Sequence, residues 1–128
     1  MRGEPVVRHE IDPDGRAVAD ARLILYELLR DRGDLIADDV LLATNELVTN
    51  VVRHTGSGGV LRVWDRGPGA PFRVEVEDAD PTIPVISAQP HDNGGRGLAI
   101  VQAVSTGWGV VPLPQGKIVW AEFSRHEQ

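Results

Sequence analysis

The chain has 128 residues, a size typical of one domain, and a formal net charge of −6. It contains no cysteine, which excludes thiol catalysis and cysteine-ligated zinc, and its acidic balance disfavours a general nucleic-acid binder. No segment is long and apolar enough to span a membrane, and the first ten residues lack the apolar core of a secretory signal. We therefore expect a single domain over residues 1–128 in the cytoplasm, with no direct nucleic-acid or membrane partner.

The first part of the chain predicts a strand followed by two helices. Pro5–Glu10 is typical of a short strand, and the turn-forming residues that follow it end it. Arg16–Arg32 predicts a helix, since apolar residues recur at helical spacing until a glycine ends the pattern. Asp34 is a plausible N-cap for a second helix over Leu35–His54, which carries its own apolar side before a glycine-rich segment.

Two alternating segments come next. Val60–Arg66 and Phe72–Asp78 each alternate apolar with polar residues, which predicts half-buried strands. The turn Gly67-Pro68-Gly69 joins them as a hairpin-like pair. Ala79–Asn93 is a proline-spaced loop without periodicity, and its length suggests a functional lid.

The last part of the chain predicts one helix and two strands. The helix begins at Gly94 and continues to about Ser105. Val110–Leu113 and Lys117–Ser124 follow as an antiparallel pair. The complete order predicts an α+β fold, a two-layer α/β sandwich with helices on one face of a mostly antiparallel sheet.

Three polar residues of the second predicted helix stack on one side of it, because Glu46, Asn50 and His54 are spaced four residues apart. The side-chain oxygen of Asn50 can ligate Mg²⁺, which prefers oxygen ligands. The carboxylate of Glu46 can accept a proton from a water or hydroxyl held nearby. The spacing alone favours a simpler interpretation, in which Glu46 is solvated and the other two are polar residues near a helix end.

Asp78 ends its predicted strand on the same side as three apolar residues, so the core face of the strand ends in a carboxylate. Burying a charge is costly unless the group is paired or hydrogen-bonded, and the amino group of adenine is one suitable partner. An aspartate that reaches solvent at the strand end, or that caps the next turn, explains the pattern equally well.

The segment Gly94-Gly95-Arg96-Gly97 stands at the start of the third predicted helix. Glycines let the backbone approach an anion closely, and a helix N-terminus offers unpaired N–H groups and the positive end of a dipole. Arg96 adds a cation. The segment lacks the Gly-Lys-Ser/Thr of a P-loop, and an ordinary loop-to-helix turn is the alternative interpretation.

Taken in order, these features resemble the superfamily that groups gyrases, heat-shock chaperones, histidine kinases and MutL. Leu41–His54, LLATNELVTNVVRH, resembles the N-box helix of that superfamily, and Asp78 in VEVEDADP resembles its adenine-binding aspartate. Gly94–Leu98 in NGGRGLAIV resembles the second glycine box, and Gly116–Phe123, GKIVWAEF, resembles the closing strand. The pattern fits best with the small single-domain branch, the anti-sigma factor serine kinases and their actinobacterial relatives.

The resemblance implies a Bergerat-type ATP-binding fold that holds ATP and Mg²⁺ between the helices and the sheet. Glu46 would be the catalytic base and Asn50 the magnesium ligand. In relatives the closing strand usually reads Gly-Lys-Thr, and its threonine contributes to the adenine pocket, where this chain has Ile118. The residues implied in nucleotide binding are Asn50, Arg53, His54, Asp78, Gly94, Gly95, Arg96, Gly97, Leu98 and Ile118.

The function implied by the resemblance is that of a serine/threonine protein kinase that regulates transcription. A sigma factor would be the sequestered partner, an anti-anti-sigma antagonist would be the phosphorylated substrate, and homodimers are common in the family. The alternative is a nucleotide-dependent or nucleotide-independent interaction module without kinase activity, which the loss of the hydroxyl at Ile118 slightly favours. A fragment of a larger ATP-hydrolysing machine or sensor kinase is a third, less favoured interpretation.

Overall fold

Eight helices and strands make up the part of the chain that the computed structural model describes, residues 3–54, 56–82 and 93–124, with residues 54 and 93–96 described by their backbone alone. In chain order they are β1 (Val7–Ile11), α1 (Ala17–Leu29), α2 (Ala37–His54), β2 (Gly59–Asp65), β3 (Phe72–Asp78), α3 (Asn93–Val104), β4 (Gly107–Leu113) and β5 (Gly116–Phe123).

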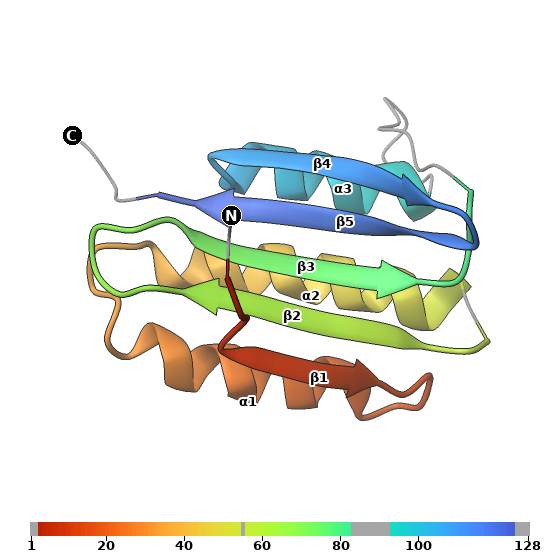
Figure 1. The fold of residues 1–128 in the computed structure, drawn as a ribbon, viewed down its shortest axis with the longest axis horizontal. Helices are drawn as coiled ribbons and strands as arrows, with labels where there is room; N and C mark the ends of the chain where they lie inside the picture. Colours follow the sequence, from red (N-terminus) through yellow and green to blue (C-terminus); the bar gives the residue numbers. More distant parts are fainter. Residues whose placement is uncertain (1–2, 55, 83–92, 125–128) are drawn as a thin grey trace.

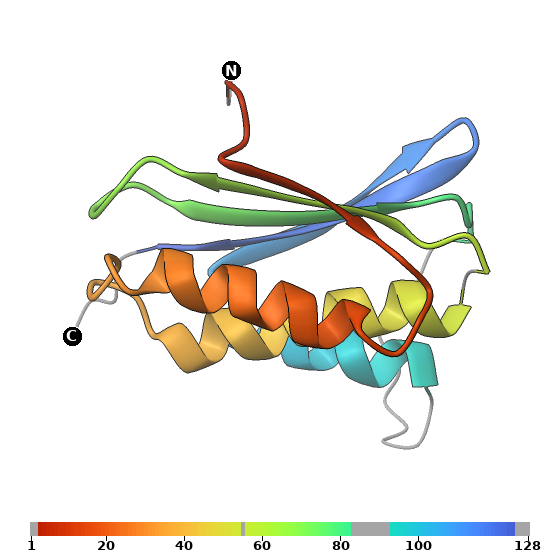
Figure 2. The same ribbon diagram turned by 90° about the horizontal axis from the view of Figure 1, so that it is seen from below.

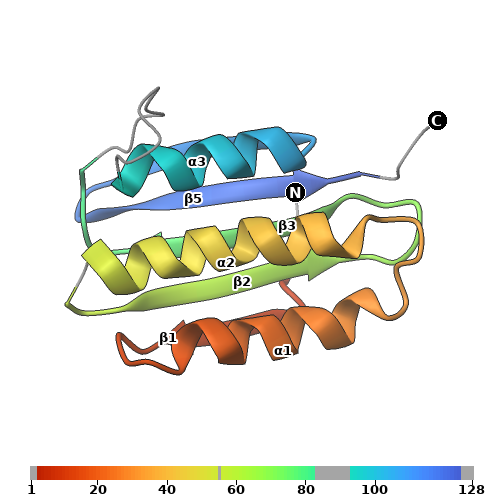
Figure 3. The same ribbon diagram turned by 180° about the vertical axis from the view of Figure 1, so that it is seen from behind.

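The five strands form one sheet in the order β1-β2-β3-β5-β4, and every neighbouring pair is antiparallel (Figure 1). The three helices lie side by side on a single face of this sheet, which leaves the other face open (Figures 2 and 3). The predicted α+β two-layer fold is therefore confirmed. The register places Asp78 of β3 directly opposite Lys117 of β5, so two charged residues meet at one end of the sheet.

The core lies between the two layers and follows the alternation of the sequence. Leu61 and Val63 of β2 and Val74 of β3 are completely buried on the side that faces the helices. The helices contribute their apolar stripes, including Leu25 of α1 and Val48 of α2. Burying a leucine or valine side chain stabilises a fold by roughly 1.5–3 kcal/mol, so these stripes hold the helices against the sheet.

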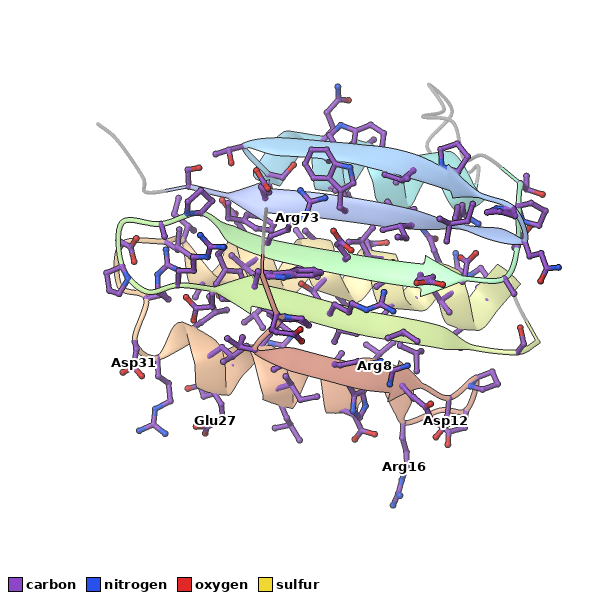
Figure 4. The ribbon with its side chains drawn as sticks, viewed as in Figure 1. Arg8, Asp12, Arg16, Glu27, Asp31 and Arg73 are labelled. Atoms are coloured by element: carbon purple, nitrogen blue, oxygen red, sulfur yellow. The ribbon has the colours of Figure 1, made fainter. Side chains whose placement is uncertain are left out.

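The open face of the sheet contains an ion-pair network that alternation alone does not predict, since Arg73 and Glu75 occupy outward positions and are nevertheless buried. Arg73 donates hydrogen bonds of 2.8 Å to the carboxylates of Glu75 and of Glu122 on β5. Its guanidinium also lies 4.3 Å from the ring centroid of Trp120. Figure 4 shows Arg73 on the face that no helix covers. The ring and the paired carboxylates exclude water from this cation.

The segment between α1 and α2 differs from the prediction. Helix α1 ends at Leu29 and α2 begins at Ala37, so the predicted N-cap at Asp34 is wrong. The carboxylate of Asp34 instead accepts hydrogen bonds from the Arg32 guanidinium, at 3.0 and 3.1 Å, and from the backbone N–H of Gly69 at 3.0 Å. Arg32, which is only 1% exposed, also donates a hydrogen bond to Asp65 and thereby links this segment to the β2–β3 turn.

The remaining boundaries agree with the prediction to within a few residues. Strand β4 begins at Gly107, three residues earlier than expected, because its pairing with β5 extends to Glu122. The predicted lid over Ala79–Asn93 lies largely outside the described residues, which stop at Thr82 and resume at Asn93. Over the ranges that the structure describes, none of the three helices is both long enough and apolar enough to cross a membrane.

Candidate functional site

A cavity of about 160 Å³ lies between the two layers, where β3 ends and where α2, α3 and β5 come together. This volume is below the roughly 300–1,000 Å³ of sites that enclose a whole drug-sized ligand, so the described walls leave room for only part of a ligand of that size. Apolar side chains form most of the surface, and several polar residues also line it. The lining residues are Leu47, Asn50, Val51, Val76, Asp78, Asp80, Thr82, Leu98, Lys117 and Val119.

Local periodicity explains why these residues meet. Leu47, Asn50 and Val51 are three and four residues apart on α2, and therefore share one side of the helix. Two residues of β3 and two residues of β5 reach the cavity by the two-residue period of a strand. Asn50 thus stands at the border between the buried stripe of α2 and solvent, and its side chain is half-buried.

Asp78 lines the cavity and is held by a compact set of hydrogen bonds. Its Oδ1 accepts from the backbone N–H of Asp80 at 3.0 Å and from the ammonium of Lys117 at 3.0 Å. Lys117 Nζ also donates to the carbonyl oxygen of Asp80 at 2.8 Å. The side chains of Asp78 and Lys117 are only 7% and 9% exposed. A nearly buried carboxylate is therefore compensated by a nearly buried cation.

A close backbone approach supports this arrangement. A side chain on Gly116, at the start of β5, would collide with the carbonyl oxygen of Asp78. Glycine at this position therefore allows β5 to lie tight against the end of β3 and brings the next residue, Lys117, beside the Asp78 carboxylate.

Glu46 and Asn50 meet the start of α3 beside the cavity. A methyl group placed on Gly97 would lie 3.0 Å from Glu46 Oε2, 3.5 Å from Asn50 Nδ2 and 3.6 Å from Asn50 Oδ1. The glycine thus leaves a small space that is faced by a carboxylate and a carboxamide, four residues after α3 begins at Asn93. Oxygen donors of this kind fit Mg²⁺, and the N-terminus of α3 fits the phosphates that accompany the ion.

The other predicted site residues are distributed around this centre. Leu98 is buried and lines the cavity, directly after Gly97. Arg53 is exposed on α2 and does not line the cavity. Gly94 and Gly95 lie in the first turn of α3. The side chains of His54 and Arg96 are outside what the structure describes.

The structure separates Ile118 from the cavity. The inward positions of β5 are those of Lys117, Val119 and the alternate residues after them, whereas Ile118 is half-buried and belongs to the open face. The family resemblance implies a place for Ile118 in the adenine pocket and assigns no role to Lys117. Lys117 lies two residues before the apolar Val119. This spacing is the sequence signal for an inward position of Lys117, because residues two apart on a strand share a face.

A second, larger depression of about 680 Å³ lies at the same end of the sheet and shares Asp78 with the cavity. It is an open groove between the end of β1, the start of β2 and the β4–β5 turn. Among the predicted site residues it includes Asp78 alone. The smaller cavity is thus the one that brings the predicted residues together.

Two solved structures with a similar fold are from Mycobacterium tuberculosis and Acinetobacter baumannii. The RsbU and RsbW domains of Rv1364c from Mycobacterium tuberculosis match with a TM-score of 0.70 at 20% identity, over 95% of this chain and 33% of that one. The histidine kinase AdeS of Acinetobacter baumannii matches with a TM-score of 0.52 at 17% identity, over 94% of this chain and 68% of that one. At these identities the likeness shows the fold alone.

Sequence comparison identifies a curated relative of this chain and a family whose sequence model matches it. An uncharacterised protein of Streptomyces coelicolor is 38% identical over 69 residues, which are 51% of this chain and 66% of that protein. The chain thus spans about two thirds of that relative and a third of the Mycobacterium chain. The sequence model of the histidine kinase-like ATPase domain matches residues 11–123, almost the whole chain. The chain therefore belongs to the histidine kinase-like ATPase domain family, within the superfamily of gyrases, heat-shock chaperones, histidine kinases and MutL.

Proposed function

We propose that this protein is an ATP-dependent serine/threonine protein kinase of the anti-sigma type, which acts in the cytoplasm. The observation that carries the proposal is the convergence of Asn50, Asp78 and Leu98 on one cavity, although they come from three different elements. Family membership supports ATP as the ligand, and the RsbW likeness supports the anti-sigma branch.

The adenine ring occupies the cavity in this proposal. Its apolar walls, which include Leu47, Val76 and Leu98, contact the two faces and edges of the base. The carboxylate of Asp78 accepts a hydrogen bond from the 6-amino group. This group has no counterpart in a purine that carries a carbonyl at position 6, so the contact selects adenine.

The phosphates lie toward the N-terminus of α3, where Gly94 and Gly95 expose backbone N–H groups. Asn50 ligates Mg²⁺ through its side-chain oxygen, and Arg96, Arg53 and His54 supply further polar contacts. When bound, the ion neutralises charge on the phosphates, which is its usual contribution to phosphoryl transfer. Glu46, beside Asn50, takes the proton from the serine or threonine hydroxyl of the protein substrate.

The partners in this proposal are proteins. The phosphorylated substrate is an anti-anti-sigma antagonist, and a sigma factor is the partner that the kinase sequesters. A homodimer is the assembly that the family resemblance suggests for this kinase.

The test separates the roles of Glu46 and Asn50. Asn50→Ala is expected to abolish Mg²⁺-dependent ATP binding, because it removes the ligand oxygen, whereas Glu46→Gln is expected to keep ATP binding and lose phosphorylation of purified anti-anti-sigma proteins. Calorimetry measures the first effect, and transfer of radiolabelled phosphate measures the second. We expect a rate loss of roughly 10²–10⁴-fold for Glu46→Gln, the range typical of a general base.

Two results would redirect the assignment. Tight, Mg²⁺-dependent ATP binding by Asn50→Ala would remove the metal role from that residue. ATP binding without phosphorylation of any antagonist by the unaltered protein would select the non-catalytic interaction module instead.

A further inference from the structure

The ion pair that lines the cavity has two hydrogen-bonding positions without a partner among the described residues. Both described donors to Asp78, the Asp80 N–H and the Lys117 ammonium, reach Oδ1, so Oδ2 receives no hydrogen bond from the described residues. Lys117 Nζ has three N–H donors and two acceptors in the described part of the chain, Asp78 Oδ1 and the Asp80 carbonyl oxygen. One acceptor and one donor therefore stand next to each other, on two residues that both line the cavity.

Buried polar groups of this kind usually have a partner. The side chain of Lys117 is 9% exposed and that of Asp78 is 7% exposed, so both side chains are nearly buried beside the cavity. The apolar walls that surround them, among them Val76 and Val119, offer no polar atoms. A ligand in the cavity is the natural source of the missing acceptor and donor.

The edge of adenine presents the complementary pair. Its 6-amino group is a donor, and the neighbouring ring nitrogen N1 is an acceptor, so the two lie side by side on the edge that proteins read by hydrogen bonding. We propose that Lys117 is a specificity-determining residue that donates a hydrogen bond to N1 of adenine, while Asp78 accepts from the 6-amino group. This inference rests on the proposed function and adds Lys117 to its nucleotide site.

The backbone fixes the pair before the base arrives. Asp78 is held by the N–H of Asp80, and Lys117 is held by the carbonyl oxygen of the same residue. The Asp80 carboxylate in turn accepts from the N–H of Thr82 at 2.9 Å, which defines the turn that follows β3. Neither charged group has to be ordered when the ligand binds, so the two hydrogen bonds are gained at little entropic cost.

The experiment compares ATP with 1-deaza-ATP, in which a C–H group replaces N1. Calorimetric titration of the unaltered protein in the presence of Mg²⁺ should show 1-deaza-ATP binding at least about tenfold more weakly, the effect of one hydrogen bond to a charged donor. Lys117→Met should bind ATP at least about tenfold more weakly and should no longer distinguish the two nucleotides. Arg62→Met is the matched control, since Arg62 pairs with Glu77 on the open face and lies away from the cavity.

The outcomes that would overturn the inference are distinct from those that would overturn the proposed function. Equal affinity of the unaltered protein for ATP and 1-deaza-ATP would refute the contact with N1, and this comparison needs no variant that has to fold. ATP binding by Lys117→Met that is unchanged or tighter would refute a favourable hydrogen bond between the ammonium and the base. A complete absence of ATP binding by the unaltered protein would refute the proposed function, and this inference with it.

Discussion

Ile118 illustrates how one step along a strand moves a side chain to the opposite face of a sheet. Its neighbours in the sheet are Glu77 and Val111, which belong to outward positions, and its own side chain is half-buried. The loss of a threonine hydroxyl at this position therefore affects the open face and not the cavity.

The first prediction follows from that placement. Ile118→Thr should change the affinity for ATP by less than about twofold, because a hydroxyl on the open face gains no hydrogen bond to the base. Calorimetry with ATP and Mg²⁺ measures the change. A gain of about fivefold or more would mean that the side chain at this position does reach the nucleotide.

Gly97 controls how closely α3 approaches α2. The added methyl group of Gly97→Ala would lie 3.0 Å from Glu46 Oε2, so the carboxylate has to shift by a few tenths of an ångström. We expect phosphorylation to fall roughly tenfold or more, since catalytic groups tolerate little displacement. The thermal unfolding temperature should be maintained, because alanine is the better helix former by about 1 kcal/mol.

The control for Gly97→Ala is the same substitution at Gly33, where a methyl group meets nothing within 4 Å. This variant should keep full activity. Full activity of Gly97→Ala as well would show that Glu46 does not need its present position, and would weaken its assignment as the base.

The connection between α1 and α2 depends on Arg32, whose guanidinium joins Asp34, Asp65 and the carbonyl oxygen of Ala70. Arg32→Met should lower the free energy of unfolding by roughly 2–3 kcal/mol. This is less than the ~3–5 kcal/mol for breaking a fully buried pair, because both carboxylates are still 14% exposed. Chemical denaturation measures the loss. Arg30→Met is the control, because Arg30 and its partner Glu27 are 66% and 70% exposed and should contribute almost nothing.

The same network makes the stability of the protein depend on pH. The Arg32 guanidinium and the N–H of Gly69 hold the pKa of the Asp34 carboxyl well below its usual range. A depressed pKa in the folded state means that the contribution of Asp34 is fully present above the unfolded value of about 3.9 and is lost as the pH falls below it. Asp34→Asn should therefore be less stable than the unaltered protein at neutral pH, with a difference that shrinks in acid. A difference that is constant between pH 7 and pH 3 would contradict this assignment.

The fold as a whole was largely predictable because its signals are local. The alternation of Val60–Arg66 and Phe72–Asp78 and the helical stripe of Leu35–His54 each identify an element and its buried side. The sequence also identified Asp78 as a carboxylate on a core face. Strand order and register depend on contacts between distant residues, which no local pattern contains.

The parts that escaped prediction are pairings across the sheet or between loops. Arg32 bonds to a residue 33 positions away, and Lys117 to one 39 positions away. Each pairing turns an apparently solvated charge into a buried one, and the sequence gives no sign of the partner. The burial of Arg73 and Glu75 on the open face has the same origin, since Trp120 and Glu122 come from another strand.

The central claim is that the cavity at the end of β3 binds ATP through Asp78. The most direct measurement is calorimetric titration of the protein with ATP, with and without Mg²⁺, alongside Asp78→Asn and Glu77→Gln. Glu77 is the matched control, since it is the neighbouring carboxylate on the opposite face and pairs with Arg62. We predict saturable, Mg²⁺-dependent binding that Asp78→Asn weakens at least about tenfold and Glu77→Gln leaves unchanged. An absence of binding at millimolar ATP, or equal affinities of the two variants, would contradict the claim.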